Sequence, residues 1–129
     1  MKSSIVSWLL RIIVAVIFMQ TLYFKFTGAP ESIYIFSKLG AEPYGRIGTG
    51  ILELIAAILV LVPGTVLLGA LIGLGIISGA ILSHIFVLGI EVQDDGGSLF
   101  MLALTVFSCC AILVYLNKSK IPDLLKFKL

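Results

Sequence analysis

The sequence predicts an all-α integral membrane protein, a bundle of four transmembrane helices in a single domain. Hydrophobic residues make up 60% of the 129 residues and charged residues only 12%, and the mean hydropathy is +1.18. A soluble domain is roughly half apolar and about a quarter charged. A soluble chain this short would also lack the interior volume to bury so much apolar surface. Lipid must therefore solvate the outside of the fold, and one domain over residues 1–129 suits this length.

Four apolar stretches define the expected spans. Each is near the length of about 20 residues that crosses ~30 Å of hydrocarbon as a helix. None of them alternates apolar and polar residues as the strands of a membrane barrel do. The expected spans cover about residues 5–26, 46–62, 66–90 and 98–116.

Two of the connections carry the chemistry of turns. Pro63 and Gly64 predict a tight turn between the second and third spans, because proline presets φ and glycine accepts positive φ. This turn makes the two spans an antiparallel hairpin. Before the fourth span comes a polar segment, residues 94–97, and Ser98 is placed to cap the helix that follows.

A short amphipathic helix is expected between the first and second spans. Gly28 ends the first span, and Pro30 suits the first turn of a new helix. Apolar residues then recur at helical spacing as far as Gly40, namely Ile33, Phe36 and Leu39. We expect residues 31–39 to lie as a helix at the membrane surface, with a plain loop as the alternative.

The distribution of lysine and arginine predicts the orientation, and an even number of spans places both termini on one side. Basic residues gather near the termini: Lys2, Arg11, Lys118, Lys120, Lys126 and Lys128. The opposite side has Lys25, Lys38 and Arg46, but its other connection is acidic, with Glu91, Asp94 and Asp95. We interpret this acidic cluster as an outside turn in preference to a cation site. The termini are therefore expected in the cytoplasm and the chain in the cell (inner or plasma) membrane.

The third span is rich in small residues, which let helix backbones approach closely in lipid. Gly69 and Gly73 form one GxxxG pair, and Gly75, Gly79 and Ser83 continue on a neighbouring face. Either face can pack within the chain or form the seam of a homo-oligomer. The pattern leaves both open.

Ionisable groups inside the spans are the main functional signal. At ~1.5 Å per residue, Glu53 in the second span and His84 in the third each lie about 9–11 Å below the outer surface. Gln20 and Lys25, late in the first span, fall at comparable or shallower depth. An acidic group at the centre of a span costs about 3 kcal/mol, so Glu53 is expected to face the bundle interior. Three helices thus offer polar groups to one layer of the membrane.

Two interpretations of this layer stay open. Glu53 paired with Lys25 or His84 can be a buried clamp that fixes helix register, or these groups can line a pocket that binds a ligand or handles protons. A metal site is not expected, because one histidine and one carboxylate are a poor ligand set. A haem held by two histidines would need a second subunit, since His84 is the only histidine.

The other polar residues of the spans are expected to be structural. Arg11 is close enough to the inner end of the first span for its side chain to reach the headgroups. Arg46 shares a helix face with Glu53 but would have a long reach to it. Cys109 and Cys110 are adjacent and project about 100° apart on a helix, so they are expected to pack as apolar groups without a disulfide.

The motifs of several enzyme classes are absent from the sequence. It has no CxxC pair, no Walker glycine loop, no HExxH and no GxSxG. It also contains no soluble region large enough to hold a separate catalytic apparatus. We therefore expect no independent catalytic activity. A net charge of +2 is too small to indicate nucleic acid as a partner.

Six short motifs follow one another along residues 8–116, and their order and spacing form a pattern. They are Leu10-Arg11-Ile12, Tyr23-Phe24-Lys25-Phe26, Gly50-Ile51-Leu52-Glu53-Leu54, Ser83-His84, Leu88-Gly89-Ile90 and Asp95-Gly96-Gly97-Ser98-Leu99-Phe100. Together they resemble the DoxX family, including its DoxX-like and MauE-like branches. The resemblance implies a four-helix membrane protein associated with redox systems, such as quinone-coupled sulfur oxidation or membrane assemblies of oxidant-defence enzymes. The positions that it carries over are Arg11, Lys25, Glu53 and His84, and it supplies no substrate.

We therefore expect an accessory subunit of a redox-associated membrane complex, with lipid and other membrane or redox subunits as partners. Glu53 and His84 would line a pocket that faces quinone or lipid, with Lys25 or Gln20 completing it. A bound quinone would accept hydrogen bonds from these side chains and exchange protons with them. The alternatives are a membrane oxidoreductase acting on quinone, a small proton-coupled transporter and a membrane assembly factor.

Overall fold

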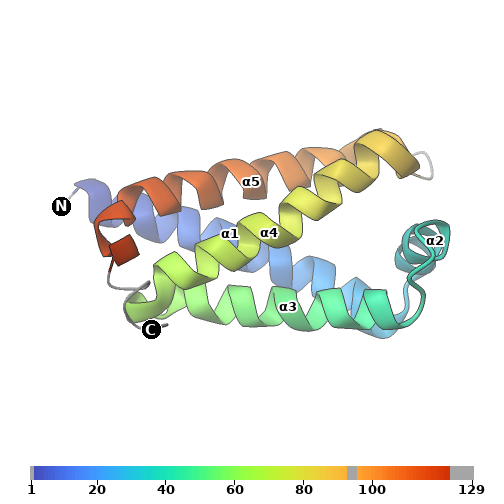
Figure 1. The fold of residues 1–129 in the computed structure, drawn as a ribbon, viewed down its shortest axis with the longest axis horizontal. Coiled ribbons are helices and arrows are strands. Elements are labelled where there is room, and N and C mark those ends of the chain that lie inside the picture. Colours follow the sequence, from blue (N-terminus) through green and yellow to red (C-terminus); the bar gives the residue numbers. More distant parts are fainter. Residues whose placement is uncertain (1, 93–95, 123–129) are drawn as a thin grey trace.

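The computed structural model describes residues 2–92 and 96–122 and is all-helical over them. Four of its helices are long and apolar enough to cross a membrane. They are α1 (Lys2–Thr27), α3 (Tyr44–Leu61), α4 (Val66–Ser83) and α5 (Ser98–Leu116). The predicted four-helix bundle is thereby confirmed within the described residues. The start of α1 and the end of α5 lie at one end of the bundle, and the short helix α2 (Pro30–Lys38) lies at the other (Figure 1).

The four long helices pack in a ring in which each contacts two neighbours. α1 lies against α3 and α5, and α4 lies against the same two helices on the other side. The turn at Pro63–Thr65 joins α3 and α4 as the predicted antiparallel hairpin. From this turn α4 rises across the bundle, so that it leaves α3 and meets α5 at the α2 end (Figure 1). At the α2 end, α4 therefore lies farther from α3 than it does at the Pro63–Thr65 turn (Figure 1).

The core is a narrow column of side chains along the bundle axis. Its largest fully buried members are Phe18, Leu113, Val14, Val60, Val106 and Cys110. Cys109 belongs to the same core, and both cysteines are free thiols. Large apolar side chains also cover the outside of all four long helices, as a surface that faces lipid requires.

Gly69 and Gly73 allow the close packing of α4 within the chain. A Cβ added at Gly69 would lie 2.6 Å from the backbone nitrogen of Val60 in α3, and one at Gly73 would lie 2.9 Å from the Cys110 sulfur in α5. Such contacts are too short to exist without movement of the neighbour. The Gly69/Gly73 face is therefore occupied inside the chain, and the suggested seam between two copies cannot form there.

The segments around the helices test two sequence predictions. The short helix α2 is present and is flanked by Gly28 and Gly40, whose φ angles are +68° and +75°. Helix α5 begins at Ser98, and Gly97 occupies the N-cap position with φ +85°, so the predicted cap at Ser98 was wrong by one residue. A left-handed backbone at that position suits glycine, since serine would strain there. Of the acidic turn, Asp94 and Asp95 lie outside the described residues.

The end of α4 is also irregular. A π-helical turn, His84–Leu88, follows directly on α4, and Gly89 ends it with φ +83°. The predicted third span of 66–90 thus corresponds to α4 plus this turn. A π-turn widens the helix by one residue and often marks a functional site. Here it begins at the only histidine of the sequence.

Candidate ligand cavity at the α2 end of the bundle

A cavity of about 350 Å³ lies at the α2 end of the bundle. Its walls come from α1, α2, α3, α5 and the last turns of α4 with the π-turn, and most lining side chains are apolar. This volume is at the small end of the range for small-molecule sites, roughly 300–1,000 Å³. Lys25, Glu53 and His84 all line it. Three of the residues predicted from their depth therefore meet at one cavity.

Helix α2 covers this cavity with a mixed face. Its lining residues are Glu31, Ser32, Ile35, Phe36 and Leu39, and Ser32 is buried. The sequence indicated an apolar face of Ile33, Phe36 and Leu39, but the Ile33 side chain is exposed. The helix therefore contributes a carboxylate and a hydroxyl to the cavity, which the apolar periodicity did not predict.

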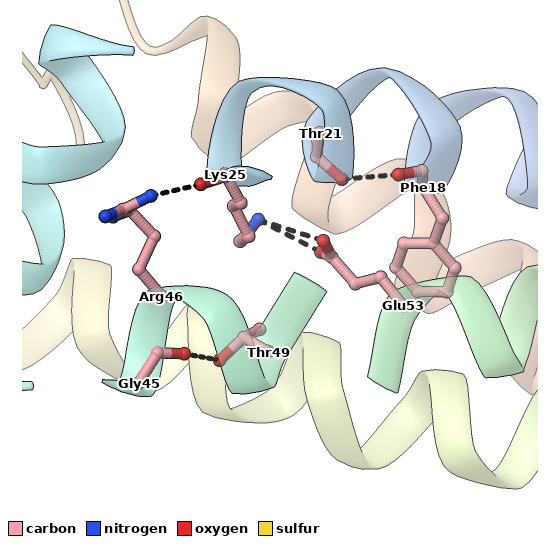
Figure 2. Close-up of polar contacts among 7 residues, drawn as sticks. All are labelled: Phe18, Thr21, Lys25, Gly45, Arg46, Thr49 and Glu53. Carbon is pink, nitrogen blue, oxygen red and sulfur yellow. Dashed lines mark hydrogen bonds and ion pairs between the residues drawn. The ribbon is translucent and has the colours of Figure 1, made fainter. Parts of the chain in front are cut away.

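The centre of the site is an ion pair between α1 and α3 (Figure 2). Lys25 Nζ lies 3.1 Å from both carboxylate oxygens of Glu53, and its contact with Oε2 is a hydrogen bond. The side chains of Lys25 and Glu53 are 15% and 5% exposed. The pair is therefore shielded from both water and lipid, and it fixes the rotation of α1 relative to α3.

One oxygen of this carboxylate has an unused lone pair. Glu53 Oε1 is buried and accepts no hydrogen bond from any residue that the structure describes. The Thr21 hydroxyl lies near the carboxylate, but it donates to the Phe18 carbonyl at 3.1 Å. Since the Lys25 ammonium lies 3.1 Å from this oxygen, the ion pair compensates its charge without a hydrogen bond of regular geometry.

His84 lies on another wall of the cavity, at the start of the π-turn. Its side chain is buried, and its ring packs edge-on against Phe100 at a centroid distance of 5.5 Å. Nδ1 lies 3.0 Å from the Gly89 carbonyl, and the Gly89 N–H donates to the His84 carbonyl at 2.7 Å. The π-turn thus closes on itself and holds the imidazole in one orientation.

Gln20 does not take part in the site. It is exposed on the surface of α1 and does not line the cavity. Of the two residues that sequence depth offered to complete the pocket, Lys25 is the one that faces Glu53. The two positions lie five residues apart, and five helical steps of about 100° place them on different faces of α1.

Arg46 is held away from Glu53 by other partners. Its guanidinium pairs with the Glu42 carboxylate at 2.8 Å. It also donates to the backbone carbonyl of Lys25 near the end of α1 (Figure 2). The last carbonyls of a helix have no donor within their own helix, and the helix dipole favours a cation there. The long-range pairing of Arg46 with Glu53 therefore does not occur.

Arg11 makes the reciprocal contact at the terminal end of the bundle. Its guanidinium donates to the carbonyls of Val60 and Leu61 in the last turn of α3, the second at 2.8 Å, and stacks over the Trp8 ring. With 4% of its surface exposed, Arg11 is buried. The predicted extension to the headgroups was therefore wrong, because the open carbonyls of α3 are nearer. Each of the two antiparallel helices thus receives an arginine from the first half of the other.

Comparison with known proteins adds no relative. No protein family, curated protein or solved structure matches the chain. The resemblance to the DoxX family therefore stays a prediction. Among the described residues, no group of three or more histidine, cysteine, aspartate or glutamate side chains could hold a metal ion. The functional evidence is the cavity, with its ion pair and its oriented histidine.

Proposed function

We propose that this multi-pass membrane protein is a DoxX-like accessory subunit of a redox-associated membrane complex, and that its cavity binds the head of an amphipathic ligand, a quinone or a lipid. The observation that supports the proposal is the apolar cavity into which one ion pair and one histidine project. Small-molecule sites commonly combine apolar walls with a few polar groups that orient the ligand.

The chemistry of the cavity favours binding over independent catalysis. Neither cysteine lines it, so it lacks a thiol nucleophile. The Lys25 ammonium is already paired with Glu53, which leaves Glu31 and His84 as the ionisable lining groups outside that pair. Such a site can hold and orient a redox-active molecule for a partner subunit.

The proposed orientation places the cavity in the outward half of the cell (inner or plasma) membrane, with both termini in the cytoplasm. The support for it is the set of basic residues near the termini, because cytoplasmic ends carry an excess of lysine and arginine. The cavity is lined by α2, which lies at the opposite end of the bundle from the start of α1 and the end of α5 (Figure 1). A ligand would therefore enter from the outer leaflet or from the surface that α2 covers.

Two glycines of α4 offer a matched test of the cavity. A Cβ added at Gly79 or at Gly75 would meet nothing within 4 Å, but only Gly79 lines the cavity. Gly79→Leu should therefore occupy part of the cavity from a Cβ that meets no neighbour, whereas Gly75→Leu adds the same side chain elsewhere on the same helix. Both changes gain the same helix propensity.

The experiment is mass spectrometry of the small molecules that co-purify with each protein from native lipid. The wild type and Gly75→Leu should carry the same quinone or lipid in stoichiometric amount, and Gly79→Leu should lose most of it. The same preparations in mild detergent would report partner subunits. The absence of any enriched quinone or lipid from the wild type, or its equal retention by Gly79→Leu, would overturn the proposed binding function.

A further inference from the structure

A second cavity, of about 210 Å³, lies at the end of the bundle where α1 begins and α5 ends. Its volume is below the range of roughly 300–1,000 Å³ that is usual for small-molecule sites, so it suits one polar group rather than a whole ligand. In contrast to the cavity at the α2 end, most of its lining residues are polar. They are Ser4, Ser7, Trp8, Arg11, Leu116 and Asn117.

The lining residues of α1 lie on one face of the helix. They are spaced by three or four residues between Ser4 and Arg11, and residues so spaced are neighbours on a helix surface. The seven steps from Ser4 to Arg11 cover about 10 Å along the helix axis. Ser4 is exposed, whereas Arg11 is buried. The cavity therefore leads from the surface at this end of the bundle to the guanidinium.

The Arg11 guanidinium still has a nitrogen to offer. Nε and Nη2 donate to the last carbonyls of α3, whereas Nη1 makes no hydrogen bond with the described residues. Among those residues, Glu53 Oε1 is the only fully buried side-chain nitrogen or oxygen without a hydrogen-bond partner, so Nη1 retains accessible surface. Since Arg11 lines the cavity, this nitrogen is within reach of a group that enters it.

The charge of Arg11 has no carboxylate partner within the described residues. The two ion pairs found there are Lys25–Glu53 and Arg46–Glu42. Helices α1, α4 and α5 contain no aspartate or glutamate. The open carbonyls at the end of α3 carry about half an elementary charge and compensate Arg11 only in part. Because a buried charge is normally paired, the remainder favours an anion in the cavity.

The other polar side chains of the cavity can also donate. The hydroxyls of Ser4 and Ser7 make no hydrogen bond with the described residues, whereas that of Ser83 donates to its own helix. Asn117 Nδ2 donates to the Leu113 carbonyl at 2.8 Å and has a second hydrogen left. The cavity thus combines a guanidinium with neutral donors and has no carboxylate in its lining. This combination suits the oxygens of a phosphate group.

The surface around the cavity indicates that the phosphate belongs to a lipid. Exposed apolar side chains flank the lining residues on both helices, such as Ile5 and Leu9 on α1 and Ile112 on α5. Such a surface can hold acyl chains beside a bound headgroup. Lys118 is exposed and follows Asn117 directly, so it adds positive charge at the same end. Basic pockets between spans on the cytoplasmic side bind anionic headgroups.

We propose that this cavity binds the phosphate of an anionic phospholipid, with Arg11 Nη1 as the charged donor and with Ser4, Ser7 and Asn117 as further donors. The site is separate from the cavity at the α2 end and does not depend on the function proposed for that cavity. A hydrogen bond to a charged group is strong enough that loss of the phosphate should weaken binding about tenfold to a hundredfold.

The test measures the affinities of matched probes for the full chain in micelles of a neutral maltoside, by isothermal titration calorimetry. The probes are dioctanoylphosphatidylglycerol, dioctanoylglycerol, which has the same acyl chains and no phosphate, and inorganic phosphate. Trp8 is the single tryptophan and lines the cavity, so its fluorescence reports whether a probe binds at this end. Phosphatidylglycerol should bind about tenfold or more tightly than dioctanoylglycerol and should change the Trp8 fluorescence.

Variants assign the binding to this cavity. Ser7→Leu places a larger apolar side chain among the lining residues and leaves Arg11 in the chain, so it should weaken phosphatidylglycerol binding about tenfold or more. Ser37→Leu is the matched control, because it adds the same side chain on the exposed side of α2. Gly79→Leu occupies part of the other cavity and should keep the affinity of the wild type.

The outcomes separate this site from its alternatives. Equal affinity of the wild type for the two lipids, or no binding of either, would overturn the phosphate site. Tighter binding of inorganic phosphate than of phosphatidylglycerol would assign the cavity to a soluble anion and overturn the lipid as its source. Loss of phosphatidylglycerol binding in Gly79→Leu but not in Ser7→Leu would place the lipid at the α2 end. Because the first comparison uses the wild type, it does not depend on how well any variant folds.

Discussion

Removal of Lys25 should expose how much the ion pair stabilises the bundle. In Lys25→Met the Glu53 carboxylate stays 5% exposed and has lost the ammonium 3.1 Å from both of its oxygens. Loss of one partner of a buried pair costs about 3–5 kcal/mol, because the other charge remains buried and uncompensated. Glutamate inside a span is already disfavoured by about 3 kcal/mol on insertion scales. We therefore expect the free energy of unfolding to fall by about 3 kcal/mol.

The double variant distinguishes a stabilising pair from a merely tolerated one. Lys25→Met with Glu53→Leu replaces both charges by apolar groups of similar size, and such replacements are often neutral or stabilising. Glu53→Leu alone leaves a lysine that is 15% exposed and has a long stem, so it should cost about 1–2 kcal/mol. We expect the double variant to lie within about 1 kcal/mol of the wild type.

Unfolding by SDS from mixed micelles provides the assay, followed by far-UV circular dichroism and by the fluorescence of Trp8, the single tryptophan. Lys38→Met is the matched control, since Lys38 is an exposed lysine of α2 whose hydrogen bond and cation–π contact within the described residues are both with Tyr34. This control should change stability by less than about 0.5 kcal/mol. The reasoning would be refuted by a Lys25→Met protein as stable as the wild type, or by a double variant no more stable than Lys25→Met.

Three further predictions use the same preparations. Gly69→Ala should lower the free energy of unfolding by about 1–3 kcal/mol, because its Cβ would meet the backbone of α3 at 2.6 Å. Gly75→Ala should raise the free energy of unfolding by up to about 1 kcal/mol. Equal effects of the two changes in SDS unfolding would contradict the assigned packing. Maleimide should label neither Cys109 nor Cys110 in the folded protein and both in SDS, and rapid labelling of the folded state would show that the core around α5 is open. On intact cells a membrane-impermeant maleimide should label Ser37→Cys on the exposed side of α2, and labelling that requires permeabilisation would reverse the proposed orientation.

The sequence by itself was sufficient for the architecture. Each of the four spans is visible as an apolar run, because lipid imposes a length and a hydropathy that every spanning helix must meet alone. The turn at Pro63 and the short helix after Pro30 follow from local backbone preferences in the same way. The interior position of Glu53 also followed, because an unpaired carboxylate facing lipid costs too much.

Only the tertiary structure decided which polar groups meet. Depth in the membrane could be estimated from residue counts. That Lys25 and not Gln20 pairs with Glu53 depends on how each helix is rotated about its axis. The same rotation decides that Arg46 pairs with Glu42 and not with Glu53. The position of Glu31 and Ser32 at the cavity depends likewise on where α2 lies. Helix rotation and crossing are set by packing between segments far apart in the chain, such as Gly69 against α3. An apolar run that is hydrophobic all round carries no signal of that rotation, so side-chain partners inside the bundle emerge only when the helices are assembled.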